Sequence, residues 1–113
     1  MLELSIQDPH FNEKMQVVEA LHQVIDPELF VNIIDLGLVY DIAFPADNRL
    51  VITMTLSTPH CPLGEAIEAG IHHVLEPLFP DKTIEVDIVW EPPWDFSMMT
   101  AEGRRQLGIE EDE

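Results

Sequence analysis

Cysteine, basic residues and long apolar runs are all scarce in this sequence. A single cysteine in 113 residues excludes an internal disulfide, so nothing indicates an oxidising compartment. No apolar run reaches the ~18 residues of a membrane-spanning helix, and the first residues lack the basic and apolar regions of a secretory signal. We therefore expect a soluble cytoplasmic protein that makes no membrane contact.

Positive charge is so rare that it restricts the class of partner. Five Lys and Arg stand against 22 Asp and Glu, and the formal net charge is −17. A field of this sign repels phosphate backbones, which argues against direct nucleic-acid binding. It favours cations, metals or a basic protein surface, although the same acidity also serves solubility alone.

Length and apolar content describe one globular domain. The chain has 113 residues, of which 46% are hydrophobic, and a chain of this size buries a sizeable core without disulfides. We assign residues 1–11 to an N-terminal segment, residues 12–109 to the domain and residues 110–113 to a solvated acidic tail.

Apolar residues at helical spacing predict two main helices and a short third one. The first is expected over residues 12–24, with Asn12 as its N-cap. The second and most regular is expected over residues 62–75, between prolines at both ends. The third is expected over residues 100–107, capped by Thr100 and stopped by a glycine.

Alternating apolar residues predict three strands, over residues 38–44, 50–56 and 83–90. The turn residues between the first two make them a hairpin. An irregular apolar stretch at residues 31–34 is a candidate fourth strand. The order helix–strand–strand–helix–strand predicts a small two-layer α/β (α+β) domain with a mixed sheet of three to four strands, two main helices and a short C-terminal helix.

The hairpin register predicts where the cysteine lies. If Phe44 pairs near Leu50, residues 33–37 approach residues 57–61 at one end of the sheet. The second helix starts at that end, and a third strand parallel to the second returns to it. Crevices at such strand ends are favoured binding places. The side chains expected to share this neighbourhood are those of Asp35, His60, Cys61, Trp90 and Trp94.

Cys61 is placed at the N-cap of the long helix or just before it. The partial positive charge of a helix N-terminus stabilises a thiolate, while the acidic surroundings oppose it. A thiolate there is a ligand for a soft metal such as iron, or a nucleophile with only His60 close in sequence as a base. A buried, inert thiol is the structural alternative.

Four segments, in order, resemble signatures of one protein family: "DPEL", "NIIDLGLVYDI", "MTLSTPHCPL" and "VWEPPWDFSMMTAEGRRQLGI". That family contains bacterial SufT, the PaaD-type proteins and the eukaryotic cytosolic iron–sulfur targeting subunit. The resemblance covers residues 17–109 and is closest to the SufT-like members. It implies a small two-layer α/β fold and a non-enzymatic role in maturing iron–sulfur proteins, as a carrier, scaffold or targeting adaptor.

The resemblance also implies a set of site residues and no catalytic one. The family's cysteine falls on Cys61, which is implied as the contact to iron or a cluster and as the metal ligand. Trp94 and Arg104 fall in the C-terminal element and are implied to bind partners. His60 departs from the small residue that relatives often have there. The residues implied to support the site are Asp26, Glu28, Asp35, Thr58 and His60.

The resemblance leaves several alternatives open. PaaD-type members carry extra cysteines in a C-terminal extension, and this chain has none, so an accessory role for a multicomponent oxygenase is the alternative interpretation. One thiolate does not hold a cluster alone, because clusters take about four ligands. This constraint is met if two chains contribute Cys61 in a homodimer, or if an external thiol completes the ligand set. It is also met if the protein is a pure adaptor without cluster contact. The implied cofactor is at most transient iron or an iron–sulfur cluster, and the implied partners are the assembly machinery and client apoproteins.

Overall fold

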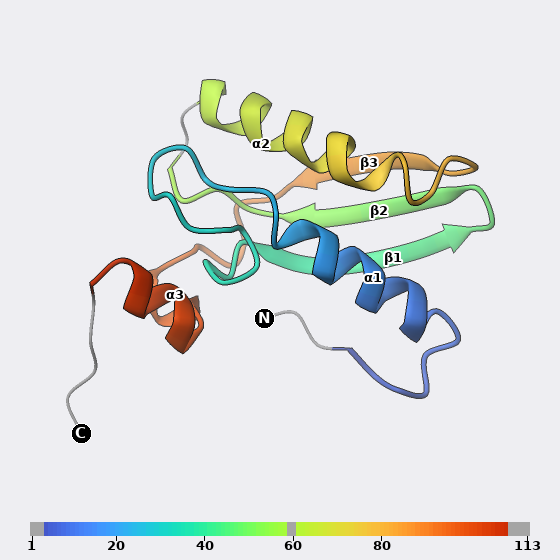
Figure 1. Ribbon diagram of the computed structural model, residues 1–113, viewed down its shortest axis with the longest axis horizontal. Helices are drawn as coiled ribbons and strands as arrows, with labels where there is room; N and C mark the ends of the chain where they lie inside the picture. Colours follow the sequence, from blue (N-terminus) through green and yellow to red (C-terminus); the bar gives the residue numbers. More distant parts are fainter. Residues whose placement is uncertain (1–3, 59–60, 109–113) are drawn as a thin grey trace.

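The computed structural model describes residues 4–58 and 61–108, and for residues 61–63 it describes the backbone alone. The order of elements agrees with the sequence prediction (Figure 1). In chain order they are α1 (Phe11–Leu21), β1 (Val39–Ala46), β2 (Arg49–Met54), α2 (Cys61–Leu75), β3 (Thr83–Ile88), the 3₁₀ helix η1 (Phe96–Met98) and α3 (Ala101–Gln106). The predicted acidic tail, residues 110–113, lies outside the described residues.

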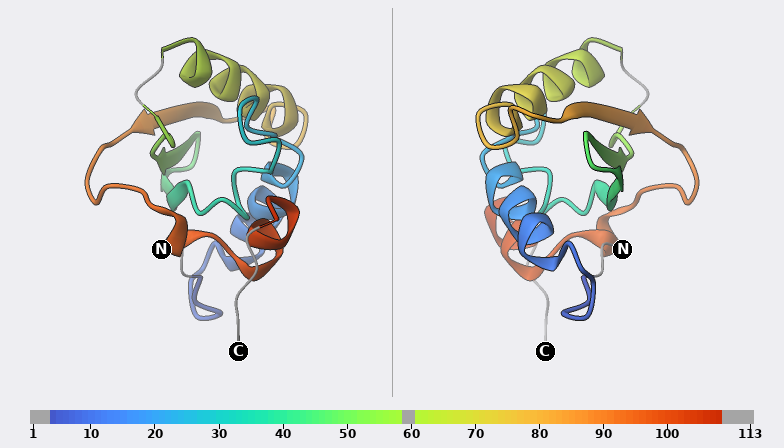
Figure 2. Two further views of the ribbon diagram at one scale, coloured as in Figure 1. Left: turned by 90° about the vertical axis from the view of Figure 1, so that its left-hand side faces the viewer. Right: turned by 90° about the vertical axis from the view of Figure 1, so that its right-hand side faces the viewer.

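The sheet is mixed and three-stranded, in the order β1-β2-β3. β1 and β2 are antiparallel, whereas β2 and β3 are parallel, as predicted. Figure 2 shows α1 and α2 on one face of this sheet, which confirms two layers. No helix of the described residues is long and apolar enough to cross a bilayer. The largest fully buried side chains lie between the layers and include Leu21, Ile33, Leu36, Leu38, Ile42, Leu50, Ile52, Met54, Ile67, Ile71 and Leu75.

The register of the hairpin differs from the prediction by one residue at the end nearest the cysteine. Ile42 pairs with Ile52, which is the predicted register. A bulge between Val39 and Asp41 then shifts the pairing, so that Thr55 donates its amide to Leu38 at 2.9 Å. Because a bulge inserts one residue into one strand, the shift is local and the two segments still meet at the same end of the sheet.

The start and the end of α1 differ from the prediction. His10, not Asn12, precedes the helix, and its side chain makes no capping bond. The chain is turned instead by Asp8, whose carboxylate accepts the His10 amide at 2.7 Å and whose carbonyl accepts the Phe11 amide at 3.0 Å. The helix ends at Leu21, three residues before the predicted end, because the amides of Gln23 and Val24 donate to the carbonyls of Ala20 and Leu21, three residues back, instead of continuing the α-helical pattern.

The candidate fourth strand at residues 31–34 does not form among the described residues. A single antiparallel bridge joins Ile25 to Asn32. The residues that follow turn sharply, with the Leu36 amide bound to the Asn32 carbonyl at 3.0 Å and Gly37 at a φ of +78°. A chain that turns within a few residues has no length over which to build a ladder.

The segment after β3 is fastened to the turn over residues 32–37. Figure 2 shows this segment swinging out from β3 and returning past β1 to α3. The indole N–H of Trp94 donates to the Leu36 carbonyl at 2.7 Å, and the Tyr40 hydroxyl donates to the Pro92 carbonyl at 2.8 Å. Burial raises the pKa of Tyr40 above its ordinary value, with a further contribution from the negative charges of Asp95 and Glu91. The Tyr40 hydroxyl therefore remains a neutral donor.

The segment over residues 98–103 packs on the same turn, and one glycine on each side allows the close approach. A Cβ on Gly37 would lie 2.2 Å from the Met98 carbonyl oxygen, and a Cβ on Gly103 would lie 2.6 Å from the Asp35 carbonyl oxygen. Thr100 caps α3, as predicted, by accepting the Gly103 amide at 3.0 Å. Gly108, at a φ of +80°, follows the helix as the predicted stop. Backbone thus packs directly on backbone at this interface.

Gly103→Ala is expected to destabilise the protein by about 1–3 kcal/mol, because the new methyl group meets a backbone oxygen that has no room to move. Chemical denaturation measures this change. Gly64→Ala is the matched control, since its Cβ meets only the end of the Leu56 side chain at 3.2 Å. Alanine is otherwise the better helix former by roughly 1 kcal/mol, so equal stability of the two variants would refute the close packing of α3.

Trp94→Phe is expected to cost about 1 kcal/mol of unfolding free energy, because the indole donor to the Leu36 carbonyl is lost. Trp90→Phe is the control; Trp90 lies beyond the end of β3 with 49% of its surface exposed, and the expected cost there is within about 0.5 kcal/mol. Urea denaturation compares the two. If Trp94→Phe were as stable as the parent, the indole would be free to serve a partner instead.

Candidate functional site

Cys61 is the first residue of α2, one residue earlier than the predicted helix start. This position lies at the end of the sheet where β1 begins and β2 and β3 end (Figure 1). The Cys61 side chain and all of His60 lie outside the described residues. The partial positive charge of the helix N-terminus acts on a thiol at such a position and favours its thiolate form. Exposure of the thiol and the role of His60 stay predictions.

Asp26 is a fully buried carboxylate that closes the turn over residues 26–31. Its Oδ1 accepts the amides of Glu28 at 2.7 Å and Leu29 at 3.0 Å. Its backbone closes the same turn, because the Asp26 carbonyl accepts the Phe30 amide at 2.8 Å and the Asp26 amide donates to Val31 at 3.0 Å. A buried charge requires such donors, so the first acid of the "DPEL" segment has a structural task.

The turn over residues 26–31 contacts the segment that leads into α2. The Ser57 hydroxyl donates to Oδ2 of Asp26 at 3.4 Å, and Thr58, which is half-buried, follows it directly. The structure therefore brings Asp26 together with the segment that carries Thr58 and leads to Cys61. Glu28 lies exposed on the same turn. Of the predicted supporting residues, Asp26, Glu28 and Thr58 thus lie on adjacent segments.

Asp35 lies at the same end of the sheet, but its carboxylate is bound to the C-terminal segment. Its Oδ1 accepts the Thr100 hydroxyl at 2.9 Å, and its Oδ2 accepts the Asn32 side-chain amide at 2.8 Å. His22 Nε2 lies 4.0 Å from the same Oδ1. Among the described residues, no hydrogen bond or ion pair joins Asp35 to Ser57 or Thr58. Its carboxylate links α1, the turn over residues 32–37 and α3.

The two residues predicted to bind partners also contact their own chain. Trp94 is half-buried, with its indole N–H on Leu36, and Phe96 packs edge-on to its ring at 5.1 Å between centroids. A guanidinium nitrogen of Arg104 donates to the Met99 carbonyl at 2.8 Å. Both side chains hold the C-terminal segment in place. Trp90 lies at the end of the sheet where it was predicted, because Val89, the residue before it, donates its amide to the Met54 carbonyl at 2.8 Å.

Sequence reasoning missed the polar partners that connect these residues. Ser57 precedes the predicted site by one residue, and Asn32 precedes Asp35 by three, so that its Oδ1 accepts the Asp35 amide at 2.8 Å. An asparagine followed by a turn is a recognisable local signal, because its side chain bonds the backbone a few residues on. The Thr100 contact joins residues far apart in the sequence, and no local pattern indicates it.

Metal-ligating groups do not gather elsewhere in the described part of the chain, where no cluster of three His, Cys, Asp or Glu side chains suits a metal ion. Cys61 stays the predicted ligand for iron. One thiolate supplies one ligand, so an iron–sulfur cluster would require about three further ligands from outside this chain.

Comparison with known proteins gives matches that cover most of the chain. The family described as "Iron-sulfur cluster assembly protein" matches residues 14–88. The chain is 43% identical to the Fe-S protein maturation auxiliary factor YitW of Bacillus subtilis, over 86% of this chain and 95% of that protein. It is 38% identical to the Fe-S protein maturation auxiliary factor SufT of Staphylococcus aureus, over 76% of this chain and 98% of that protein.

The fold has a close counterpart among solved structures. The crystal structure of a domain of unknown function from Bacillus anthracis superposes with a TM-score of 0.76, at 41% sequence identity, and covers 84% of this chain and 91% of that one. The family match spans more than half of the chain, and the relatives are covered almost end to end. The chain therefore belongs to the iron–sulfur cluster assembly protein family.

Proposed function

We propose that this protein is a SufT-like maturation factor that makes transient contact with iron or an iron–sulfur cluster through Cys61. The observation that supports this most directly is the position of Cys61, the only cysteine, as the first residue of α2 at the end of the sheet where the signature segments meet. Family membership adds that relatives which this chain covers almost end to end are named maturation factors. Iron or the cluster is cargo in this proposal and not a resident cofactor.

The ligand count explains why the contact is transient. A single thiolate leaves most of the coordination sphere to a second copy, to an external thiol or to a client apoprotein. A carrier with one ligand releases its cargo to a client with several. In this proposal the partners are the assembly machinery and client apoproteins. The protein acts in the cytoplasm, and its role is not enzymatic.

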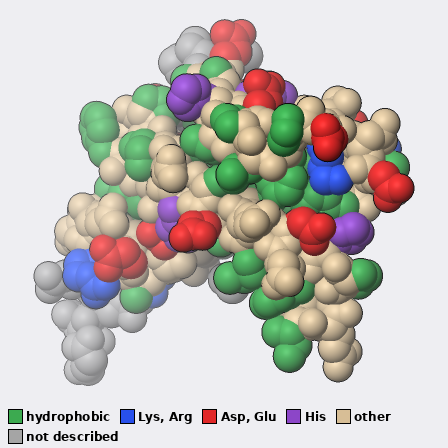
Figure 3. All heavy atoms as spheres, turned by 45° about the vertical axis from the view of Figure 1, so that its right-hand side comes forward, with side chains coloured by type: hydrophobic (Ala, Val, Ile, Leu, Met, Phe, Trp, Pro, Cys, Tyr) green, Lys and Arg blue, Asp and Glu red, His purple; other side chains and the backbone are tan. Residues whose placement is uncertain are grey.

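A pure adaptor is the second candidate, in which the protein recruits clients without touching the cluster. The observation that favours it is the acidic surface, on which basic side chains are few and most of them face an acid of the same chain (Figure 3). Such a surface attracts basic partners without any metal chemistry.

Cys61→Ser is expected to leave stability within about 1 kcal/mol, because serine is tolerated in a first helical turn, while cargo contact is lost because a hydroxyl is a poor soft-metal ligand. The measurements are denaturation, iron and sulfide content after anaerobic reconstitution, and rescue of iron–sulfur enzyme activity in a deletion strain. Cys61→Ala is the matched control, since it removes the thiol without adding a hydroxyl. Full rescue by both variants would rule out the thiolate and leave the adaptor.

Asp26→Asn is expected to cost about 1–3 kcal/mol of unfolding free energy, because the neutral amide is a weaker acceptor for the Glu28 and Leu29 amides. Ser57→Ala is the control, since it removes only the long contact to Oδ2 and is expected to cost less than about 1 kcal/mol. Urea denaturation and rescue of the deletion strain are measured together. A stable Asp26→Asn variant that fails to rescue would assign the carboxylate to the cargo and not to the turn.

A further inference from the structure

Phe30 is an exposed aromatic residue in a backbone conformation that suits glycine. Its φ is +63°, and it is the only residue other than glycine with a positive φ among the described residues. Its side chain is 77% exposed, so no core packing compensates for the strain. A bulky side chain in the left-handed region costs roughly 1–2 kcal/mol. A strained and exposed residue of this kind points to a function outside the folded core.

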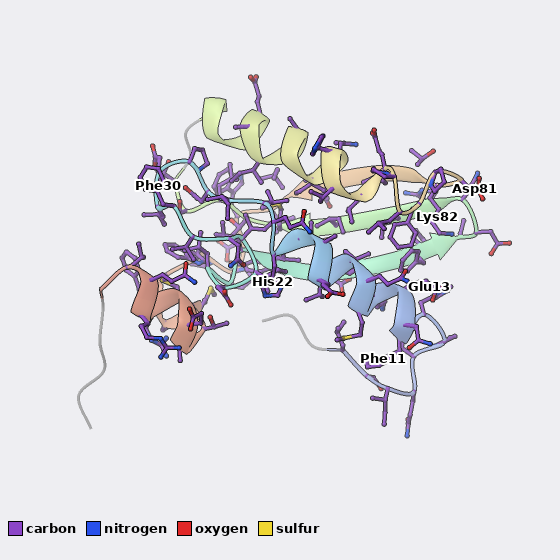
Figure 4. The ribbon with its side chains drawn as sticks, in the orientation of Figure 1. Phe11, Glu13, His22, Phe30, Asp81 and Lys82 are labelled. Carbon is purple, nitrogen blue, oxygen red and sulfur yellow. The ribbon has the colours of Figure 1, made fainter. Side chains whose placement is uncertain are left out.

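The turn that carries Phe30 is braced, so the aromatic ring is held in one place. The buried Asp26 carboxylate accepts two amides of the turn, and the Phe30 amide itself donates to the Asp26 carbonyl at 2.8 Å. Figure 4 shows the Phe30 side chain pointing away from the molecule at the end where α2 begins. The contact between Ser57 and Asp26 joins this turn to the segment leading to Cys61.

The charges on and near this turn bear on which kind of partner it attracts. No Lys or Arg occurs between Lys14 and Arg49, or between Arg49 and Lys82, so neither the turn over residues 26–31 nor the segment before Cys61 carries one. Arg104 and Arg105 lie on α3, which packs on the neighbouring turn over residues 32–37; Arg104 donates to the Met99 carbonyl at 2.8 Å, and Arg105 contacts Glu102. Lys14 and Arg49 contact Asp8 at 2.6 Å and Glu85 at 2.8 Å. A second copy with the same net charge of −17 would be repelled.

We propose that Phe30 is the anchor by which this protein docks a client iron–sulfur apoprotein, whose surface offers an apolar pocket rimmed by Lys and Arg. The inference rests on the proposed function, because the client's own cluster ligands are what complete the coordination begun at Cys61. Docking at Phe30 places the client beside the start of α2. Buried aromatic anchors supply a large share of the binding energy in protein interfaces.

The test uses a client identified by function. An iron–sulfur enzyme whose activity falls in the deletion strain is purified as its apoprotein, and its affinity for this protein is measured by calorimetry. Phe30→Gly is expected to weaken binding more than about tenfold. Its melting temperature is expected to stay within about 3 °C of the parent's, because glycine adopts a φ of +63° without strain. Phe30→Tyr, which keeps the ring, is expected to bind like the parent.

Leu78→Ala is the matched control. Leu78 is an exposed apolar side chain, 50% accessible, that follows the far end of α2, and its loss is expected to leave the affinity unchanged. Binding of the parent is also expected to weaken between about 0.1 M and 0.5 M salt, since a basic rim on the client is screened.

Three outcomes would overturn the inference. Unchanged client affinity of a folded Phe30→Gly variant removes the anchor, even where deletion of the protein still lowers client activity. A change in the oligomer mass of the purified variant assigns Phe30 to contact between copies. If no iron–sulfur enzyme loses activity in the deletion strain, the proposed function fails first, and the docking of a client fails with it.

Discussion

Backbone packed directly on backbone, between the turn over residues 32–37 and the segment over residues 98–103, is the constraint on which the rest of this small protein depends. Gly37 and Gly103 leave room for the carbonyl oxygens of Met98 and Asp35. Asp35 then binds the Thr100 amide at 2.9 Å through its carbonyl, and the Thr100 hydroxyl through its carboxylate. This docking fastens the C-terminal segment to the end of the sheet at which α2 begins.

Two carboxylates at that end have tasks that their motifs do not reveal. Asp26 organises a turn and Asp35 joins three elements, and each satisfies its charge with donors from its own chain. Carboxylates whose oxygens are engaged by donors of their own chain, the buried Asp26 and the partly buried Asp35, are poor candidates for cargo ligands, because releasing them would leave those donors without a partner. In the proposed function the contact to iron or a cluster therefore stays with Cys61, and the two acids fix where the surrounding segments lie.

Sequence reasoning recovered what depends on local pattern. Alternation located the three strands, and the threonine cap and the glycine stop located α3. It failed where distant groups compete for the same backbone. The Val24 carbonyl beyond the end of α1 pairs with the Ile33 amide, and the Asp8 side chain, not Asn12, sets the start of α1. The partners of Asp35 and Trp94 lie about sixty residues away, so the structural roles of these residues followed only from the fold.

A protein with one soft ligand and a strongly acidic surface separates two tasks, binding a client and holding the cargo, that a multi-cysteine scaffold combines. Holding a cluster tightly requires several thiolates from one chain, and such a site releases its cargo slowly. In the proposed function the affinity for a client comes from surface contacts, and the thiolate contributes a single bond that a client with more ligands displaces. Docking raises the effective concentration of the client's ligands around the cargo, which favours transfer even where the thiolate alone binds weakly. The strained, braced Phe30, on a turn without Lys or Arg, fits the binding of a client, and Cys61 at the start of α2 fits the contact to the cargo.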